Sequence, residues 1–168
     1  MLKKILFNFF LIFFIFSINF LYAETIFGKP KIIDADTLKI NSKKIRLFGI
    51  DAPELNQKCK KIYLSIFIFN FKKEYNCGVY ATNKVKSYLK NNNLKCVSSD
   101  KDKYGRYIAI CYFKDKDINS WIVKNGLAVA YRRYSKKYIT EEKYAIKNSL
   151  GIWSGNFENP ELWRKKNK

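Results

Sequence analysis

Two short apolar runs that each end in acid make residues 31–55 the segment that most constrains the fold of this chain. A turn at 41–43 separates the runs, and the alternating, β-branched pattern of residues 36–40 before it is typical of a strand. We therefore expect a β-hairpin that lays the two runs side by side in one sheet. The side chains brought to one end of that sheet are four carboxylates and one guanidinium: Asp34, Asp36, Asp51, Glu54 and Arg46.

Such a cluster contributes nothing to packing, because like charges repel unless a cation lies among them. Carboxylates are hard oxygen ligands of the kind that calcium and magnesium prefer. Taken singly, an acid at the end of a strand is usually a solvated cap. Together, and in this order, they predict a site that holds a divalent ion.

The complete absence of histidine narrows the chemistry that this site can perform. It excludes Ser-His and Cys-His catalytic groups, nucleases that use histidine as the general base, and zinc sites that use imidazole. Any hydrolysis must therefore use carboxylates, arginines, lysines and a metal with oxygen ligands.

The net charge of the chain is +19, from 33 Lys and Arg against 14 Asp and Glu. An excess of this size favours a polyanionic partner, either nucleic acid or an anionic membrane surface. A genome with a biased base composition is the alternative explanation, because Lys, Asn and Ile are frequent throughout the chain.

The N-terminal segment has the layout of a secretory signal peptide. Lys3 and Lys4 precede an apolar run over residues 5–21, and the small Ala23 stands at the expected cut. Removal of residues 1–23 takes away two lysines and no acid, which leaves a charge of +17. We expect a secreted or periplasmic protein. The alternative is an uncleaved anchor that holds the domain outside the membrane.

Four cysteines lie in the part of the chain that we expect to be exported, and an even number in an oxidising compartment predicts two disulfides. Cys96 and Cys111 lie on two apparent neighbouring strands joined by a charged turn, so we pair them. That leaves Cys59 with Cys77. Free buried thiols are one alternative, and a four-thiolate zinc site is another, although no CxxC occurs.

Residues 24–168 are expected to form one domain, in which hydrophobic periodicity separates helices from strands. The predicted helices are 78–91, 117–125 and 140–150, the last with Thr140 as its N-cap. The predicted strands or extended segments are 25–34, 36–40, 43–50, 94–99, 104–113 and 127–131. Strands that do not alternate with helices predict an α+β fold, with a closed antiparallel barrel and helices at one side.

Residues 56–76 interrupt this pattern and have the character of an insertion. The run IYLSIFIFNF at 62–71 is apolar without helical or alternating spacing. We expect an extra helix or strand packed on the domain. The alternative is an apolar lid or membrane-touching loop beside the site, because the segment directly follows Glu54.

Three motifs in the same order resemble the staphylococcal nuclease (thermonuclease) family: IDADTLKI, IRLFGIDAPE and, at 102–106, DKYGR. The resemblance extends from about Ile26 to Trp153 and so covers nearly all of the expected mature chain. It implies a five-stranded OB-fold β-barrel with three helices. OB-fold barrels commonly bind nucleic acid on one face, which agrees with the charge.

The resemblance also implies a role for each matching residue. Asp36, Asp51 and the backbone carbonyl of Ala52 would bind a calcium ion. Asp34 would lie near that ion, and Thr37 would contact its water molecules.

A second group of matching residues would act on the substrate. Glu54 would activate or orient the attacking water, and Arg46 and Arg106 would clamp the phosphate, since a planar guanidinium matches phosphate oxygens. Lys103 would hold a terminal phosphate, and Tyr131 would flank the nucleotide.

The resemblance therefore implies an exported, monomeric, calcium-dependent phosphodiesterase. Its substrates would be DNA and RNA, cut with little sequence preference to leave 3′-phosphate ends, and a membrane partner would arise only if the N-terminal segment stays uncleaved. A non-catalytic OB-fold module that binds nucleic acid or an anionic surface is the alternative from another functional class.

Overall fold

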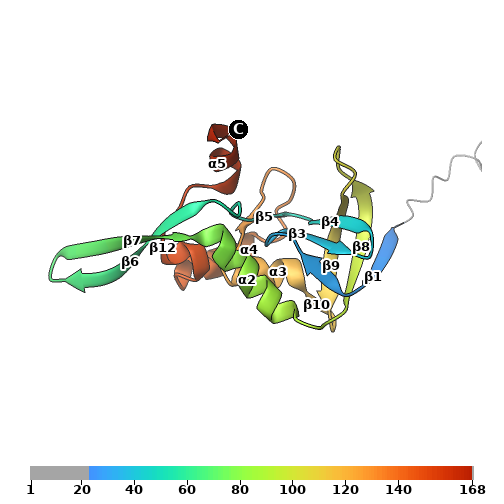
Figure 1. The fold of residues 1–168 in the computed structure, drawn as a ribbon, viewed down its shortest axis with the longest axis horizontal. Helices are drawn as coiled ribbons and strands as arrows, with labels where there is room; N and C mark the ends of the chain where they lie inside the picture. The colour runs from blue at the N-terminus through green and yellow to red at the C-terminus, as the bar shows by residue number, and fades with distance from the viewer. Residues whose placement is uncertain (1–22, 168) are drawn as a thin grey trace, which may run out of the picture.

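The computed structural model describes residues 23–167. Within that range an α+β domain of curled sheet and helices carries a long hairpin that projects from one end (Figure 1). The predicted signal segment lies outside the described residues except for Ala23. Among the residues described, no helix is both long enough and apolar enough to cross a bilayer.

The main sheet has the strand order β1-β8-β9-β4-β3-β2, with β10 added on β9. Neighbouring strands pair antiparallel, except that β4 and β9 run parallel. The bounds are β1 (Glu24–Gly28), β2 (Pro30–Ile32), β3 (Thr37–Ile40), β4 (Lys43–Leu47), β8 (Leu94–Lys101), β9 (Tyr107–Phe113) and β10 (Lys116–Asp117). The sheet is therefore a curled half-barrel of mixed strand direction, where the sequence predicts a closed antiparallel barrel.

Helices cover the sheet much as predicted. The four described α-helices are α2 (Cys77–Leu89), α3 (Ile118–Lys124), α4 (Ile139–Lys147) and α5 (Pro160–Lys166), and a 3₁₀ turn η1 (Gly151–Ser154) follows α4. The α+β class is confirmed, and the arrangement is consistent with an OB-like fold. Two details of the prediction are wrong: the residue that precedes α4 is Tyr138 rather than Thr140, and a fourth helix is present in the basic C-terminal segment.

The predicted first strand over 25–34 is divided in two, because Gly28 adopts a φ of 150° and breaks the extended chain between β1 and β2. The predicted strand at 43–50 is also divided, into β4 and β5 (Ile50–Asp51). β5 leaves the main sheet and pairs antiparallel with β11 (Val129–Ala130), so that Asp51 lies opposite Val129. Apolar side chains of the sheet and of α2 and α3 form the main core beneath these strands.

The predicted insertion is a hairpin, β6 (Lys58–Ile66) and β7 (Phe69–Asn76). At its base the short strand β12 (Gly155–Asn156) pairs with Lys60 and Lys61. The expected extra strand is therefore present, but its distal apolar residues are exposed, so the expectation that it packs on the domain is wrong. The hairpin extends away from the body of the protein in Figure 1.

Both predicted cysteine pairs are present in the structure. Cys96 and Cys111 lie directly opposite one another on β8 and β9, with Cα atoms 4.0 Å apart. Cys59 and Cys77, whose Cα atoms are 5.6 Å apart, join the base of β6 to the start of α2. The second disulfide therefore fixes the hairpin to a helix that packs on the core.

Candidate active site

Three strand ends bring the predicted acids together. The β3–β4 hairpin turns at Asn41, which has a φ of 53°, and its register places Thr37 opposite Arg46. The backbone just before β3 folds into a tight turn in which the amide of Asp36 donates to the Asp34 carboxylate at 3.0 Å. This local geometry directs both acids toward the same end of the sheet as Arg46.

The Asp36 carboxylate is almost fully buried and makes three contacts. Oδ1 accepts a hydrogen bond from the Thr37 hydroxyl at 2.9 Å and forms an ion pair with Arg46. Oδ2 accepts the backbone N–H of Ala52 at 2.7 Å. The contact with Ala52 joins the start of β3 to the loop after β5, so that the two predicted acidic segments are in direct contact.

The Asp51 side chain is completely buried, and two guanidinium groups hold it. Its Oδ1 accepts from Arg46 at 2.7 Å, and its Oδ2 accepts from Arg164 at 2.9 Å. Arg46 therefore bridges Asp36 and Asp51. A buried carboxylate requires such partners, because an unpaired charge in the interior is very costly.

Glu54 lies at the edge of this cluster, with its side chain about one-third exposed. The turn that carries it is closed by Gln57, whose backbone N–H donates to the Glu54 carbonyl at 2.8 Å. The Gln57 side chain is fully buried, accepts from the Glu54 amide and donates to the Glu158 carbonyl at 2.7 Å. Gln57 thereby connects the Glu54 turn to the segment that leads into α5.

Arg164 is a member of the cluster that the sequence does not predict. It lies on α5, and its guanidinium joins Glu54 Oε1 and Asp51 Oδ2, each at 2.9 Å. In Figure 1, α5 projects from the same side of the ribbon as the β8–β9 turn and the loop after β11. The helix is held there partly by the ion pair between Glu161 and Arg133 at 3.1 Å.

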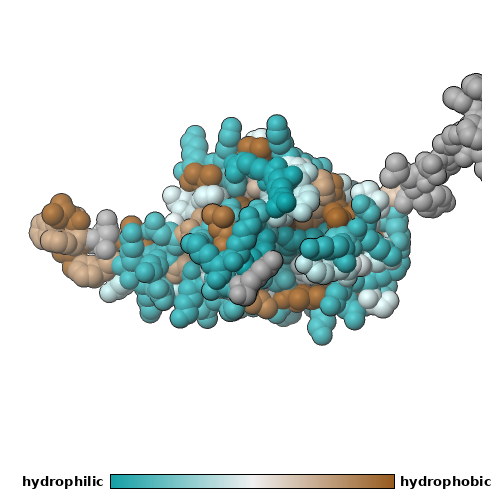
Figure 2. Space-filling view, turned by 90° about the horizontal axis from the view of Figure 1, so that it is seen from above, coloured by the Kyte–Doolittle hydropathy of each residue, from teal (hydrophilic) through white to brown (hydrophobic). Residues whose placement is uncertain are grey.

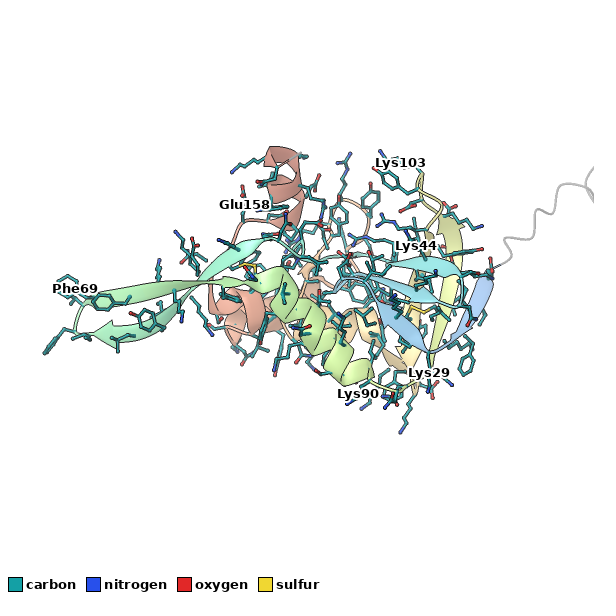
Figure 3. All side chains as sticks on the ribbon, in the orientation of Figure 1. Lys29, Lys44, Phe69, Lys90, Lys103 and Glu158 are labelled. Atoms are coloured by element: carbon teal, nitrogen blue, oxygen red, sulfur yellow. A yellow bond between two sulfur atoms is a disulfide. The ribbon has the colours of Figure 1, made fainter. Side chains whose placement is uncertain are left out.

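Arg106 occupies the turn between β8 and β9 and is paired within that turn. Its Nε donates to Asp102 Oδ2 at 2.7 Å, and Asp102 Oδ1 accepts the backbone amides of Tyr104 and Arg106. Lys103 is exposed at the end of the same turn, on the side of the ribbon where Glu158 also lies (Figure 3). Lys103 and Arg106 therefore lie on a turn. The Arg106 side chain bonds to Asp102 rather than to the buried acids, but its charge acts on the cluster and opposes the rise in the pKa of Asp34.

Tyr131 follows β11 and lies close to the cluster. Its backbone N–H donates to the Gly49 carbonyl, and its ring meets that of Tyr134 edge-on with centroids 4.8 Å apart. Partial burial and the negative charge of Asp51 raise the pKa of the Tyr131 hydroxyl. The charge of Asp51 therefore acts on the Tyr131 hydroxyl, and the contact of Tyr131 with a nucleotide stays a prediction.

In this site, burial and ion pairing shift the pKa values of the charged groups in opposite directions. Burial raises the pKa of Asp34, although Arg46 and hydrogen bonds from Thr37 act in the opposite direction. Burial lowers the pKa of Arg46 despite its bond to Asp51. For Arg164, burial is outweighed by the hydrogen bonds and charges of Asp51 and Glu54, and the pKa rises.

The donor set fits a hard divalent cation only in part. Asp36 Oδ1 and Asp51 Oδ1 face one and the same guanidinium, so two carboxylates already share a cation. Within the described range, no three acidic, cysteine or histidine side chains converge as a ready-made metal site. A cation at these two oxygens would therefore displace Arg46 and would need backbone, water or phosphate oxygens to complete its coordination.

The chain is similar to several nucleases. It is 32% identical over 146 residues to an uncharacterized endonuclease of Haemophilus influenzae, which covers 82% of this chain and 72% of that one. It is 26% identical over 156 residues to micrococcal nuclease of Shigella flexneri, over 82% and 79% of the two chains. These relatives support nuclease activity.

A third relative carries a different name. The succinoglycan biosynthesis protein ExoI of Rhizobium meliloti is 31% identical over 134 residues, which span 78% of this chain and 66% of that one. Residues 44–155 also match the family described as staphylococcal nuclease homologue, and this range contains Arg46, Asp51, Glu54 and Arg106. This chain belongs to the staphylococcal nuclease family.

Proposed function

We propose that this protein is an exported, calcium-dependent nuclease that hydrolyses phosphodiester bonds of DNA and RNA with little sequence preference and leaves 3′-phosphate ends. The observation that carries the proposal is the convergence of Asp36, Asp51 and Glu54 around arginines at one end of the sheet. The first two acids are buried, although burial of a carboxylate is costly. Buried charged groups of this kind are common at catalytic sites.

Asp36 and Asp51 would hold the calcium ion, with the Ala52 carbonyl as a further donor. When bound, the ion would neutralise charge on the scissile phosphate and help to position water. The guanidinium of Arg46 and the ion would share the same carboxylate oxygens, so calcium binding would release Arg46. Arg46 would then be free to donate to the phosphate.

Glu54 is the acid best placed to accept the proton of the attacking water, because it is the most exposed of the three carboxylates. Arg46 and Arg106 would donate to the nonbridging phosphate oxygens as negative charge develops there. Water would attack phosphorus as its proton passes to Glu54, the bond to the 5′ oxygen would break, and that oxygen would take a proton from solvent to leave as a hydroxyl. Asp34 and Thr37 would orient Asp36 and the water near the ion, and Lys103 and Tyr131 would contact the nucleotide.

The proposal is tested by digestion of plasmid DNA and of RNA by the wild-type protein and by Glu54→Gln. Activity is expected to disappear in a calcium chelator, to return with excess calcium, and to fall at least a hundredfold in the variant, because loss of a general base typically costs that much. Glu74→Gln is the matched control, since Glu74 is an exposed acid on the hairpin that pairs only loosely with Lys60.

The alternative function is a non-catalytic module that binds nucleic acid. One observation favours this alternative: Asp36, Asp51 and Glu54 each form an ion pair with an arginine. Binding of DNA with no cleavage at any calcium or magnesium concentration would establish that alternative and contradict the proposed nuclease.

A further inference from the structure

We propose that the β6–β7 hairpin is a membrane-docking element that inserts its tip shallowly into bilayers containing anionic lipid. The hairpin lies outside the proposed catalytic site, and nothing in the proposed hydrolysis uses it. Its tip is the most prominent apolar surface of the described chain: Phe67 is 100% exposed and Ile68 is 86% exposed. Figure 2 shows hydrophobic side chains at the far end of the hairpin and hydrophilic ones behind them.

The cross-strand register gives the distal hairpin an apolar face. Leu64 lies opposite Phe71, and Ile66 lies opposite Phe69, so these four side chains are on the same side of the two-stranded ribbon. Each of the four is more than 40% exposed. A contiguous apolar face that is exposed in this way marks a surface that binds a partner or a membrane.

Positive charge lies directly behind this apolar part on both strands. Lys61 is opposite Lys73, and Lys72 is opposite Ile62, so the change from charged to apolar residues on β6 lies within one residue pair of the change on β7. From Leu55 to Lys73 the sequence contains no acid. Tyr63, 60% exposed, lies at this boundary, where aromatic residues with a polar end are favoured at membrane interfaces.

This distribution fits an anionic bilayer better than a second copy of the chain. Contact between two hairpins through their apolar faces would bring the two sets of lysines together and would be opposed by charge repulsion. Anionic head groups instead provide complementary charge at the height of the lysines, while the acyl region accepts Phe67 and Ile68.

The hydrogen bonding of the hairpin limits the depth of insertion. A two-stranded ribbon has unpaired backbone groups along both outer edges, and such edges are not tolerated in hydrocarbon. The strand from Ile62 to Ile66 would span roughly 15 Å at about 3.3 Å per residue. We therefore assign only the turn around Phe67 to the acyl boundary and place the rest of the ribbon among the head groups.

A disulfide and a short strand attach the base of the hairpin to the body of the protein. The Cys59–Cys77 disulfide ties β6 to α2, and β12 pairs with β6 at Lys60 and Lys61. A Cβ at Gly155 would lie 2.0 Å from the Lys60 carbonyl, so only glycine permits this pairing. The base of the hairpin is consequently fixed to the body, and the tip, marked by Phe69 in Figure 3, projects from it.

Cosedimentation with vesicles tests this inference. Both disulfides and both core clusters lie within residues 23–167, so a chain that begins at Glu24 contains every helix and strand that the structure describes and excludes the apolar N-terminal segment. Binding to vesicles of phosphatidylcholine with about one-third phosphatidylserine is expected to weaken at least tenfold in Phe67→Ser/Ile68→Ser. The matched control is Phe27→Ser, which removes an aromatic side chain that is 61% exposed on β1.

Lysine variants test the contribution of positive charge to vesicle binding. Lys61→Gln/Lys73→Gln is expected to weaken binding several-fold, whereas Lys86→Gln/Lys90→Gln, at exposed positions in α2 and at its C-cap, should do so less. Equal binding of wild type and the Phe67/Ile68 variant would overturn the inference. So would a tip variant whose only effect is to abolish self-association measured by sedimentation without vesicles. Glu54→Gln is expected to bind vesicles normally, which separates this test from that of the nuclease.

Discussion

Arg164 on the last helix reaches Asp51 on β5, with Nη2 and Oδ2 2.9 Å apart across 113 residues of sequence. Since Asp51 is completely buried and also bonds to Arg46, two guanidiniums share one carboxylate. The C-terminal helix is thereby tied to the proposed catalytic residues, and the same contact places a positive charge on the carboxylate that a metal ion would have to share.

Replacement of Arg164 should therefore have opposite effects on stability and on calcium binding. Arg164→Ala is expected to lower the free energy of unfolding by about 1–3 kcal/mol in chelator, because a charge-assisted bond to a buried acid is lost. The calcium concentration for half-maximal activity should fall about threefold to tenfold, since a competing cation is removed. Chemical denaturation and calcium titration of activity measure the two effects.

Arg133→Ala is the matched control for this variant. Arg133 is 63% exposed and pairs with Glu161 on the same helix, so its loss should cost no more than about 1 kcal/mol and leave the calcium requirement unchanged. An Arg164→Ala protein that needs more calcium than the wild type would contradict the competition between Arg164 and the ion.

Calcium should also stabilise the fold if Asp36 and Asp51 hold it. At a concentration 100 times the dissociation constant, the ion is expected to add about 2.7 kcal/mol to the free energy of unfolding. Asp36→Asn should abolish this increase, because it removes the charge of one proposed ligand. The one oxygen that remains can accept from the Ala52 amide, and the new NH₂ group can donate to the Thr37 hydroxyl. A thermal shift by calcium that persists in this variant would place the ion elsewhere.

The convergence of the acids is predictable from the sequence because it depends on local geometry. A turn at 41–43 between alternating segments sets the register of β3 and β4, and this register brings Thr37 and Arg46 together. The pairing of Cys96 with Cys111 follows for the same reason, since a short turn joins their strands.

Features that depend on distant contacts are not predictable in this way. Arg164 lies in a run of basic residues, and no local pattern distinguishes it from an exposed tail. The hairpin strands are obscured because a bulge at Tyr63 shifts the alternation and apolar residues surround the turn on both sides. The start of α4 at Ile139 reflects burial of Tyr138, which outweighs the capping preference of Thr140.

A methyl group at Gly78 should displace the backbone of the proposed catalytic residue Glu54. Its Cβ would lie 1.8 Å from the Glu54 carbonyl oxygen, so Gly78→Ala must displace either the start of α2 or the turn that carries Glu54. We expect a loss of about 1–3 kcal/mol in stability, together with a fall in catalytic rate that exceeds any change in substrate binding. Asn83→Ala on the exposed face of the same helix is the control, and equal rates for both variants would show that Glu54 tolerates the displacement.

Because of Tyr138, the free energy of unfolding is expected to fall as the pH rises in the alkaline range. Its ring is buried, and its hydroxyl donates to Asp117 Oδ2 at 2.9 Å. Burial, together with the negative charge of Asp117, raises the pKa of this hydroxyl above its ordinary value. Because the pKa is higher in the folded state, the stabilisation is fully present below about pH 10, the unfolded value, and is lost as the pH rises toward the folded value.

Tyr138→Phe should therefore be less stable than the wild type at pH 7 by about 1.5–3 kcal/mol, the usual contribution of a hydrogen bond to a charged group. The difference between the two proteins should shrink above about pH 10, as the wild type alone loses this contribution. Lysine titration affects both proteins equally and cancels in the comparison. Tyr134→Phe, at a ring that is 64% exposed, should match the wild type throughout, and a constant gap between Tyr138→Phe and wild type up to pH 11 would contradict the raised pKa.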